Sequence, residues 1–159
     1  MSLTMLKALI SLVVAILLLI PTLAEGDAGP LPKHDNRIAT LSYFMQRHGF
    51  AQPYYVNNYI QSADNYGIDW RLLPAITLIE SSGCRFYPRI TNNCWGYGSS
   101  DGLKHWDSIP EGIDFVNQQL ANNRFYKDKD LYHKITTYNS VNPKYYGEIK
   151  NLMDEMAEK

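Results

Sequence analysis

The segment from residue 69 to residue 83 constrains the fold most, because apolar residues occupy nearly every side of a helix built from it. Asp69 is a suitable N-cap, Gly83 is a suitable stop, and residues 72–79 are mostly leucine, isoleucine and alanine. A helix that is apolar all round has to lie in the interior of a protein. Pro74, just past the first turn, is expected to cost one hydrogen bond or to bend the start of the helix. We therefore expect a core built around this helix.

Other segments repeat apolar residues at the three- and four-residue spacing of a helix with one buried face. Ser108 and Glu111 form a capping box at the start of one of them, and Asn142 followed by Pro143 is a suitable start for the last. These predicted helices cover residues 38–48, 53–66 with Pro53 as the opening residue, 108–120, 131–138 and 142–156.

The composition changes after the buried segment. Residues 84–107 mix glycine, proline, asparagine and serine with aromatic residues and have no helical pattern. Turns and short strands are expected there. The predicted fold class is therefore mainly α, a helical domain with a short irregular or small β insertion after the buried helix.

The first residues have the pattern of an export signal. Lys7 precedes an apolar run over residues 8–20, Pro21 ends the run, and residues 22–24 offer small side chains at the two positions that define a cleavage site. The run is shorter than the ~20 residues that a membrane-spanning helix needs, but an uncleaved membrane anchor is the alternative. We expect a secreted, periplasmic or cell-envelope protein. Its predicted parts are a signal peptide (1–24), a flexible linker (25–36) and one domain (37–159).

Charge and cysteine content argue against several classes of protein. The formal net charge is −1, and a near-neutral chain is not typical of nucleic-acid binders. Cys84 and Cys94 are expected to form a disulfide in an exported protein, and two buried thiols are the alternative. Two cysteines alone cannot build a zinc site, and the four histidines lack ligand spacing, so we expect neither a metal nor a cofactor.

Glu80 is the residue best suited to chemistry. It follows Leu78 and Ile79 at the end of the buried segment. Desolvation in such a place disfavours the charged form of a carboxyl group, and a protonated glutamate can act as a general acid. The alternative is a glutamate near a helix end that turns toward solvent.

Two further groups of residues could bind a sugar. Trp95 and Tyr97 lie among glycines and small polar residues such as Asn93, so that rings could stack on sugar faces while polar groups supply hydrogen bonds. The alternative is that these rings fill a small core under the loop. Tyr138 and Asn139 could face a cleft together, or could be a packed tyrosine and an asparagine that ends a helix.

Three blocks, in this order on a helical chain, resemble the lysozyme-like domain of lytic transglycosylases and bacterial glucosaminidases. YGIDWRLLPAITLIESSG at residues 66–83 is similar to the segment that leads into the family's catalytic glutamate and the serine after it. NNCWGYGSS at residues 92–100 resembles the loop that lines the family's cleft, with Trp-Gly-Tyr-Gly where well-known members have Gly-Leu-Met-Gln. TYNSVNPKYY at residues 137–146 resembles the Tyr-Asn motif that faces the bound sugar. The resemblance covers residues 59–153.

The resemblance implies a role for each matching residue. Glu80 would be the catalytic acid, Ser81 would orient it by a hydrogen bond, and Tyr138 and Asn139 would hold an N-acetyl group of the substrate. The residues that would contact or support the substrate are Ser81, Asn93, Trp95, Tyr97, Tyr138 and Asn139.

The implied activity is that of a monomeric, exported glycosidase or lytic transglycosylase. It would cleave the β-1,4 glycan backbone of peptidoglycan or of a related N-acetylated glycan. Where a second carboxylate is missing, the N-acetyl oxygen of the sugar attacks the anomeric carbon. Water then completes hydrolysis, whereas the sugar's own 6-hydroxyl gives an anhydro sugar, and both outcomes stay open.

Two other classes of function stay open as well. One is a non-catalytic glycan-binding module on the same fold, and the other is a small exported structural or interaction protein whose aromatic residues form its core. In every case we expect no nucleic-acid partner and no stable membrane insertion once the leader is removed.

Overall fold

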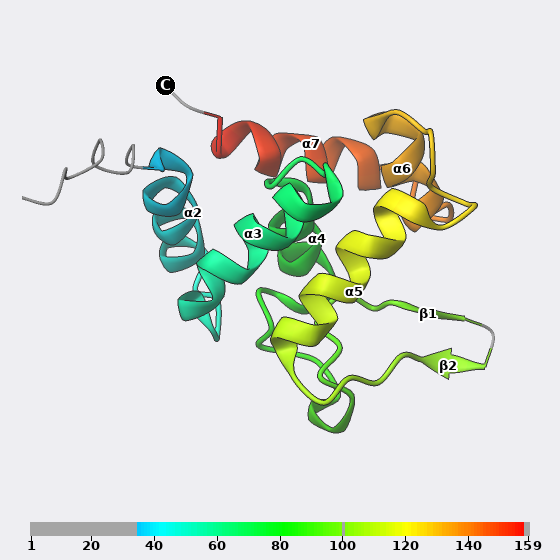
Figure 1. Cartoon of the computed structure of the whole chain (residues 1–159), viewed down its shortest axis with the longest axis horizontal. Coiled ribbons are helices and arrows are strands. Elements are labelled where there is room, and N and C mark those ends of the chain that lie inside the picture. The colour runs from blue at the N-terminus through cyan, green and yellow to red at the C-terminus, as the bar shows by residue number, and fades with distance from the viewer. Residues whose placement is uncertain (1–34, 100, 158–159) are drawn as a thin grey trace, which may run out of the picture. The chain divides into compact units, whose positions relative to one another are not determined.

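Figure 1 shows the computed structural model, which describes residues 35–99 and 101–157 of the chain. This part holds six α-helices and one two-stranded sheet, so the predicted mainly helical fold with a small β element is confirmed. The predicted signal peptide and most of the predicted linker lie outside the described residues. The α-helices are α2 (Asn36–Arg47), α3 (Val56–Tyr66), α4 (Leu72–Ser81), α5 (Ile109–Asn122), α6 (Leu131–Tyr138) and α7 (Tyr145–Glu155).

Smaller elements connect the helices. A short 3-10 helix, η1 (Pro53–Tyr55), precedes α3, and a second, η2 (Arg89–Thr91), lies in the segment after α4. In the same segment β1 (Gly98–Ser99) pairs antiparallel with β2 (Gly102–Leu103). Among the residues that the structure describes, no helix is both long enough and apolar enough to span a membrane.

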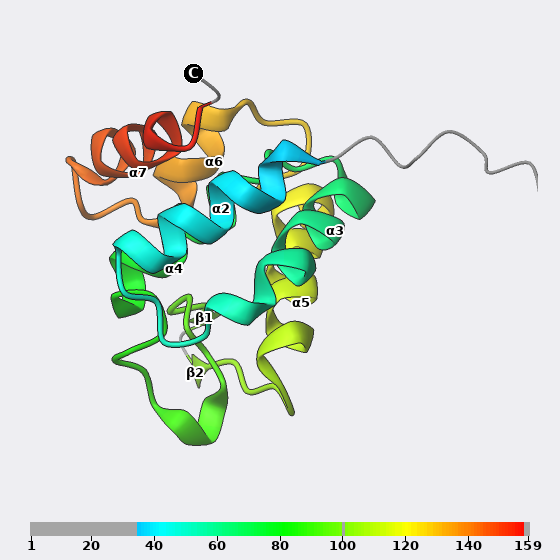
Figure 2. The same ribbon diagram turned by 90° about the vertical axis from the view of Figure 1, so that its left-hand side faces the viewer.

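The predicted buried helix is α4. Every residue from Leu72 to Thr77 is buried, as is Ser81. α4 packs against α7 and α5, while α3 packs against α5 and α2 (Figures 1 and 2). Each fully buried leucine or isoleucine of α4 contributes about 1.5–3 kcal/mol of transfer free energy. The core of the domain is thus organised around α4.

α4 begins two residues later than the sequence predicts. Asp69 does not cap the helix directly: its carboxylate accepts a hydrogen bond from the N–H of Arg71 at 3.0 Å, and its carbonyl accepts one from Leu72 at 2.9 Å. The aspartate therefore caps a turn that precedes the helix. Pro74 falls at the third helical position, where an N–H group has no partner within the helix. The expected cost of the proline is avoided for that reason.

α7 is displaced in the same way. Asn142 and Pro143 were predicted as its cap and first residue, but the helix begins at Tyr145. The Asn142 side chain accepts from the N–H of Lys144 at 2.9 Å, and its carbonyl accepts from Tyr145 at 3.1 Å. Asn142 thus caps a turn before the helix.

The capping box at the start of α5 is half formed. Ser108 Oγ accepts a hydrogen bond from the N–H of Glu111 at 3.3 Å, as predicted. The Glu111 carboxylate reaches one residue further back than expected and accepts from the N–H of Asp107 at 2.9 Å.

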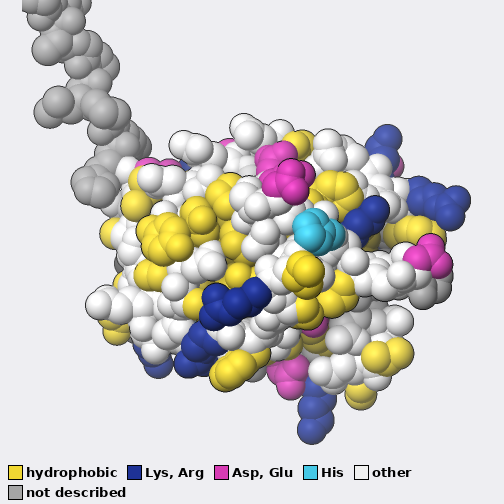
Figure 3. All heavy atoms as spheres, turned by 90° about the horizontal axis from the view of Figure 1, so that it is seen from below, with side chains coloured by type: hydrophobic (Ala, Val, Ile, Leu, Met, Phe, Trp, Pro, Cys, Tyr) yellow, Lys and Arg dark blue, Asp and Glu magenta, His cyan; other side chains and the backbone are white. Residues whose placement is uncertain are grey.

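Charged side chains of both signs share the surface. Figure 3 shows basic, acidic and hydrophobic side chains interspersed on one face of the molecule. Polar contacts connect helices: Arg37 of α2 forms an ion pair with Asp64 of α3 at 2.7 Å, and His48 Nε2, after α2, lies 2.9 Å from Glu155 Oε2 of α7. Exposed pairs of this kind contribute little, about 0–1 kcal/mol each.

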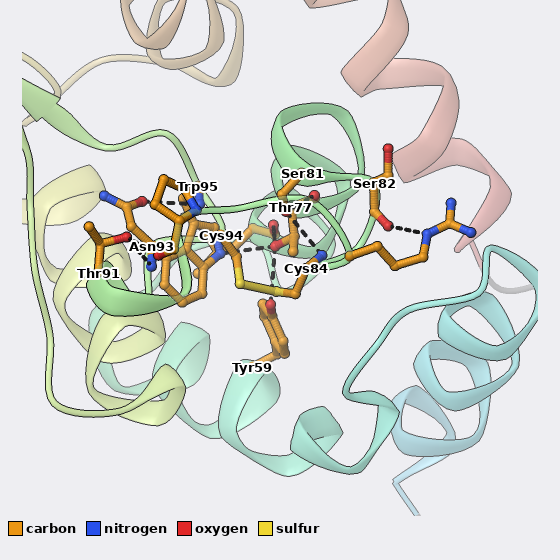
Figure 4. The surroundings of a disulfide bond; sticks show 12 residues. Tyr59, Thr77, Ser81, Ser82, Cys84, Thr91, Asn93, Cys94 and Trp95 are labelled. Atoms are coloured by element: carbon orange, nitrogen blue, oxygen red, sulfur yellow. Dashed lines mark hydrogen bonds between the residues drawn. A yellow bond between two sulfur atoms is a disulfide. The ribbon is translucent and has the colours of Figure 1, made fainter.

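The expected disulfide between Cys84 and Cys94 is present (Figure 4). It joins the turn after α4 to the aromatic segment, with the two Cα atoms 5.0 Å apart and both residues buried. Ser82, Gly83 and Cys84 all have left-handed backbone conformations, with φ of 53°, 73° and 62°. Left-handed geometry is unfavourable for residues with a Cβ, so the bridge helps to hold a turn that Ser82 and Cys84 disfavour.

Replacing both cysteines (Cys84→Ala with Cys94→Ala) should lower the free energy of unfolding by about 2–3 kcal/mol, because the bridge constrains the unfolded chain. Urea unfolding of the oxidised wild type and of the double variant measures the difference. A reductant should lower the stability of the wild type and leave that of the double variant unchanged. Identical urea midpoints for both proteins, with no effect of reductant, would contradict a structural role for the bridge.

Candidate functional site

Glu80 lies in the last turn of α4 with its side chain partly buried. Its Oε1 accepts a hydrogen bond of 2.7 Å from the hydroxyl of Tyr145, a residue that is only 1% exposed at the start of α7. The contact exists because α4 and α7 pack side by side. One oxygen of the carboxylate is therefore fixed from the core side of the molecule.

The other carboxylate oxygen lies against the aromatic turn. A Cβ placed on Gly96 would come within 2.8 Å of Glu80 Oε2, so only a glycine leaves room for the carboxylate there. Gly96 also has a φ of 62°, which a residue with a side chain rarely adopts. The Glu80 carboxylate thus sits between the Tyr145 hydroxyl and the backbone at Gly96.

Trp95 holds this turn in place from within the core. Its side chain is fully buried, and its indole N–H donates to Thr77 Oγ1 of α4 at 2.9 Å (Figure 4). The rings of Trp95 and Trp106 meet edge-on with their centroids 5.6 Å apart. The Trp95 ring also lies directly against Gly112, where an added Cβ would come within 2.3 Å of the ring. The prediction that Trp95 stacks on a sugar is therefore wrong, because its ring has no exposed face.

Asn93 shapes the turn and offers nothing to a ligand. Its Oδ1 accepts from the N–H groups of Trp95 at 3.2 Å and Tyr97 at 3.1 Å. Its Nδ2 donates to the carbonyls of Tyr97 at 2.7 Å and Lys104 at 2.9 Å. With 2% exposure and both amide donors used, Asn93 does not have the predicted substrate contact.

Ser81 does not have its predicted role of orienting Glu80. Its hydroxyl donates to the Thr77 carbonyl at 3.0 Å and accepts from the N–H of Cys84 at 3.0 Å. The serine is buried, and its one proton is used inside α4. Tyr145 makes the orienting contact instead.

Tyr138 is a packed tyrosine bonded to the turn and Asn139 is the residue that caps the end of α6, which is the alternative that the sequence left open for this pair. The Tyr138 hydroxyl donates to the Trp95 carbonyl at 2.7 Å, and its ring is parallel to that of Tyr145 with centroids 6.4 Å apart. Asn139 follows the last residue of α6, and its Oδ1 accepts from the N–H of Asn142 at 3.2 Å. Tyr138 therefore joins α6 to the turn, and Asn139 holds the loop that leads to α7.

A cavity of about 450 Å³ lies beside this carboxylate site. Gly96 belongs to its lining and also lies against Glu80 Oε2, whereas Glu80 itself is not one of the lining residues. Its polar residues include Ser99, Gln119 and Asn123, and it has no acidic residue among those that line it. The aromatic residues of the lining are Tyr97, Phe115, Phe125, Tyr126 and Tyr138.

The tyrosines of the site are held in their neutral form. Burial raises the pKa of Tyr138 well above its usual value, and burial followed by the hydrogen bond to Glu80 raises the pKa of Tyr145. Burial also raises the pKa of Tyr126 to about 12. These hydroxyls therefore act as neutral hydrogen-bonding groups.

The described residues contain no cluster of three or more acidic, histidine or cysteine side chains that could hold a metal ion.

No protein-family model, curated protein or solved structure matches this chain.

Several residues of the site escape prediction from the sequence. The lining residues Phe115 and Gln119 are four positions apart on α5 and therefore share one face of the helix. This spacing, next to the buried face of α5, is the sequence feature that indicates them. Phe125 and Tyr126 follow α5 in a segment with no pattern. Tyr145 is part of the third sequence block, but its spacing gave no sign of a contact with Glu80.

The tyrosine pKa values predict how stability depends on alkaline pH. Because these pKa values are higher in the folded state than the ~10 of an unfolded chain, their contribution to stability is fully present below about pH 10. This contribution is lost as the pH rises through the pKa values that the tyrosines have in the folded state, and the pKa of Tyr126 in that state is about 12. The free energy of unfolding, measured with urea at increasing pH, should therefore fall above about pH 10.

Tyr145→Phe removes one of these groups, so the fall should be less steep in that variant than in the wild type. Parallel curves for the two proteins would contradict a raised pKa for Tyr145.

Proposed function

We propose that this chain is an exported glycan-cleaving enzyme with a lysozyme-like fold and with Glu80 as its catalytic acid. Its substrate would be the β-1,4 backbone of peptidoglycan or of a related N-acetylated glycan. The observation that carries the proposal is the placement of the Glu80 carboxylate, bonded to Tyr145 at 2.7 Å and touching Gly96 at the edge of an aromatic cavity. The apolar leader, which lies outside the described residues, supports export.

The hydrogen bond from Tyr145 suggests which oxygen of Glu80 would carry the proton that an acid catalyst donates. Oε1 accepts from Tyr145, so a proton on the carboxyl group would reside on Oε2, the oxygen that faces the Gly96 turn. That oxygen lies next to the cavity lining, where the leaving oxygen of a bound glycan would need the proton. Tyr145 would then stabilise the carboxylate that remains, since a hydrogen bond to a charged acceptor is stronger than one to a neutral acceptor.

None of the described residues that line the cavity is an aspartate or glutamate, so the lining gives Glu80 no second carboxylate as nucleophile or base. Enzymes in this situation can use the N-acetyl oxygen of the substrate, which attacks the anomeric carbon as the glycosidic bond breaks. The carboxylate of Glu80 would next accept a proton from the incoming group. Water as that group gives hydrolysis, and the 6-hydroxyl of the same sugar gives an anhydro product.

Glu80→Gln tests the proposed acid, because the amide keeps an acceptor for Tyr145 but cannot donate a carboxyl proton. We expect the release of soluble fragments from insoluble peptidoglycan to fall by at least about 10²-fold, which is the size of a general-acid contribution. Co-sedimentation with peptidoglycan should be retained. The control is Glu155→Gln, which makes the same change on a glutamate at the C-terminal end of α7, whereas Tyr145, the partner of Glu80, lies at the start of that helix. This variant should cleave like the wild type.

Two outcomes would count against the proposal. Full activity of Glu80→Gln would remove Glu80 from the reaction. Binding without any cleavage by the wild type would favour a non-catalytic glycan-binding module.

Gly96→Ala tests whether the position of the carboxylate matters, and Gly67→Ala is its matched control. Both glycines have a left-handed backbone, with φ of 62° and 65°, but an added Cβ meets Glu80 Oε2 at 2.8 Å only at Gly96. Each variant should lose about 1 kcal/mol of stability to backbone strain. Only Gly96→Ala should also lose cleavage activity, by about tenfold or more, because it displaces the acid. Equal activities in the two variants, measured as initial rates, would show that the contact is irrelevant to catalysis.

A further inference from the structure

Of the described residues that line the cavity, Lys104 alone carries a charge. Its backbone is fixed just after β2, because its N–H donates to the Tyr97 carbonyl at 2.9 Å and its carbonyl accepts from Asn93 at 2.9 Å. Its ammonium nitrogen lies 5.9 Å from the centre of the Phe115 ring, and Phe115 lines the same cavity. The positive charge therefore lies over an aromatic surface that a ligand would contact.

No acidic side chain neutralises this charge. Within residues 35–99 and 101–157, Lys104 has no ion pair, and the cavity lining holds no aspartate or glutamate. A second cation, Arg124, is not one of the lining residues, but its guanidinium lies 4.7 Å from the centre of the ring of Phe125, which is. The cavity thus combines aromatic rings and neutral polar groups with positive charge alone.

A neutral sugar polymer would use the rings and the amides of such a cavity but not the cations. A ligand with carboxylate groups would use both, because a charge-assisted hydrogen bond to an ammonium group adds to stacking on the rings. We propose that the cavity binds an N-acetylated glycan whose sugars carry carboxylate substituents, and that Lys104 binds one of these carboxylates. The inference rests on the proposed function in taking the cavity as the glycan site, and it favours acidic peptidoglycan strands over neutral chitin-type chains.

Equilibrium binding tests this inference separately from catalysis. The probes are soluble peptidoglycan strands freed of their peptides, so that their carboxylates lie on the sugars, and the same strands after conversion of these carboxylates to methylamides. Calorimetric titration of the Glu80→Gln protein, which should not turn the strands over, gives the dissociation constant for each probe. Lys104→Gln and the charge-preserving Lys104→Arg are made in the same background. Arg89→Gln, which removes one positive charge from an exposed residue outside the cavity lining, is the matched control.

We expect Lys104→Gln to weaken binding of the acidic strands by about three- to fivefold at low ionic strength, the range for a partly exposed ion pair. Lys104→Arg should restore most of this loss, and Arg89→Gln should bind like its parent. The amidated strands should bind equally to the Lys104→Gln protein and its parent. Added salt should reduce the difference between the two proteins.

Three results would overturn the inference: an equal loss for both probes, no loss for the acidic strands, or no saturable binding of those strands. Cleavage of peptidoglycan by the wild type, with no effect of Lys104→Gln on binding, would keep the proposed function and remove only this inference. Charge-dependent binding in a wild type that cleaves nothing would remove the proposed function and keep the inference.

Discussion

The burial of Trp95 between α4 and α5 is the contact on which the rest of the site depends. Its indole N–H donates to Thr77 Oγ1 of α4, and the same oxygen is hydrogen-bonded to the Tyr59 hydroxyl of α3 at 3.1 Å. The Thr77 side chain therefore links the aromatic turn to both helices. Its carbonyl accepts from Tyr138, and the residue after it, Gly96, touches the Glu80 carboxylate. A shift of this ring would move the cavity lining and the acid relative to each other.

Three kinds of interaction fix the turn at residues 93–97 before any substrate is bound. The disulfide joins Cys94 to the turn after α4, Asn93 satisfies the backbone of its own turn with its side chain, and the Trp95 ring fills the core. The lone catalytic carboxylate proposed here requires such order, because a misplacement of about 1 Å can reduce a rate by ~10². Residues 93–97 are therefore held in place although they belong to no helix or strand.

Much of the helical framework could be predicted from the sequence, because apolar spacing records which faces are buried. Asp69 and Asn142 misled the prediction of two helix starts, since a short polar side chain caps a turn as readily as a helix. The role of Trp95 could not be predicted, because the composition of a loop does not tell which rings face inward. The Glu80–Tyr145 hydrogen bond joins residues 65 positions apart and depends on how α4 meets α7, which periodicity does not encode.

The most direct test of Glu80 as a catalytic acid in glycan cleavage is mass spectrometry of the products that the wild-type protein releases from purified peptidoglycan. The proposed mechanism predicts fragments cut at the bonds between N-acetylated sugars, with either new reducing ends or anhydro ends, that are missing from the Glu80→Gln digest. Intact strands after prolonged incubation with well-folded wild-type protein, or the same fragments from both proteins, would contradict it.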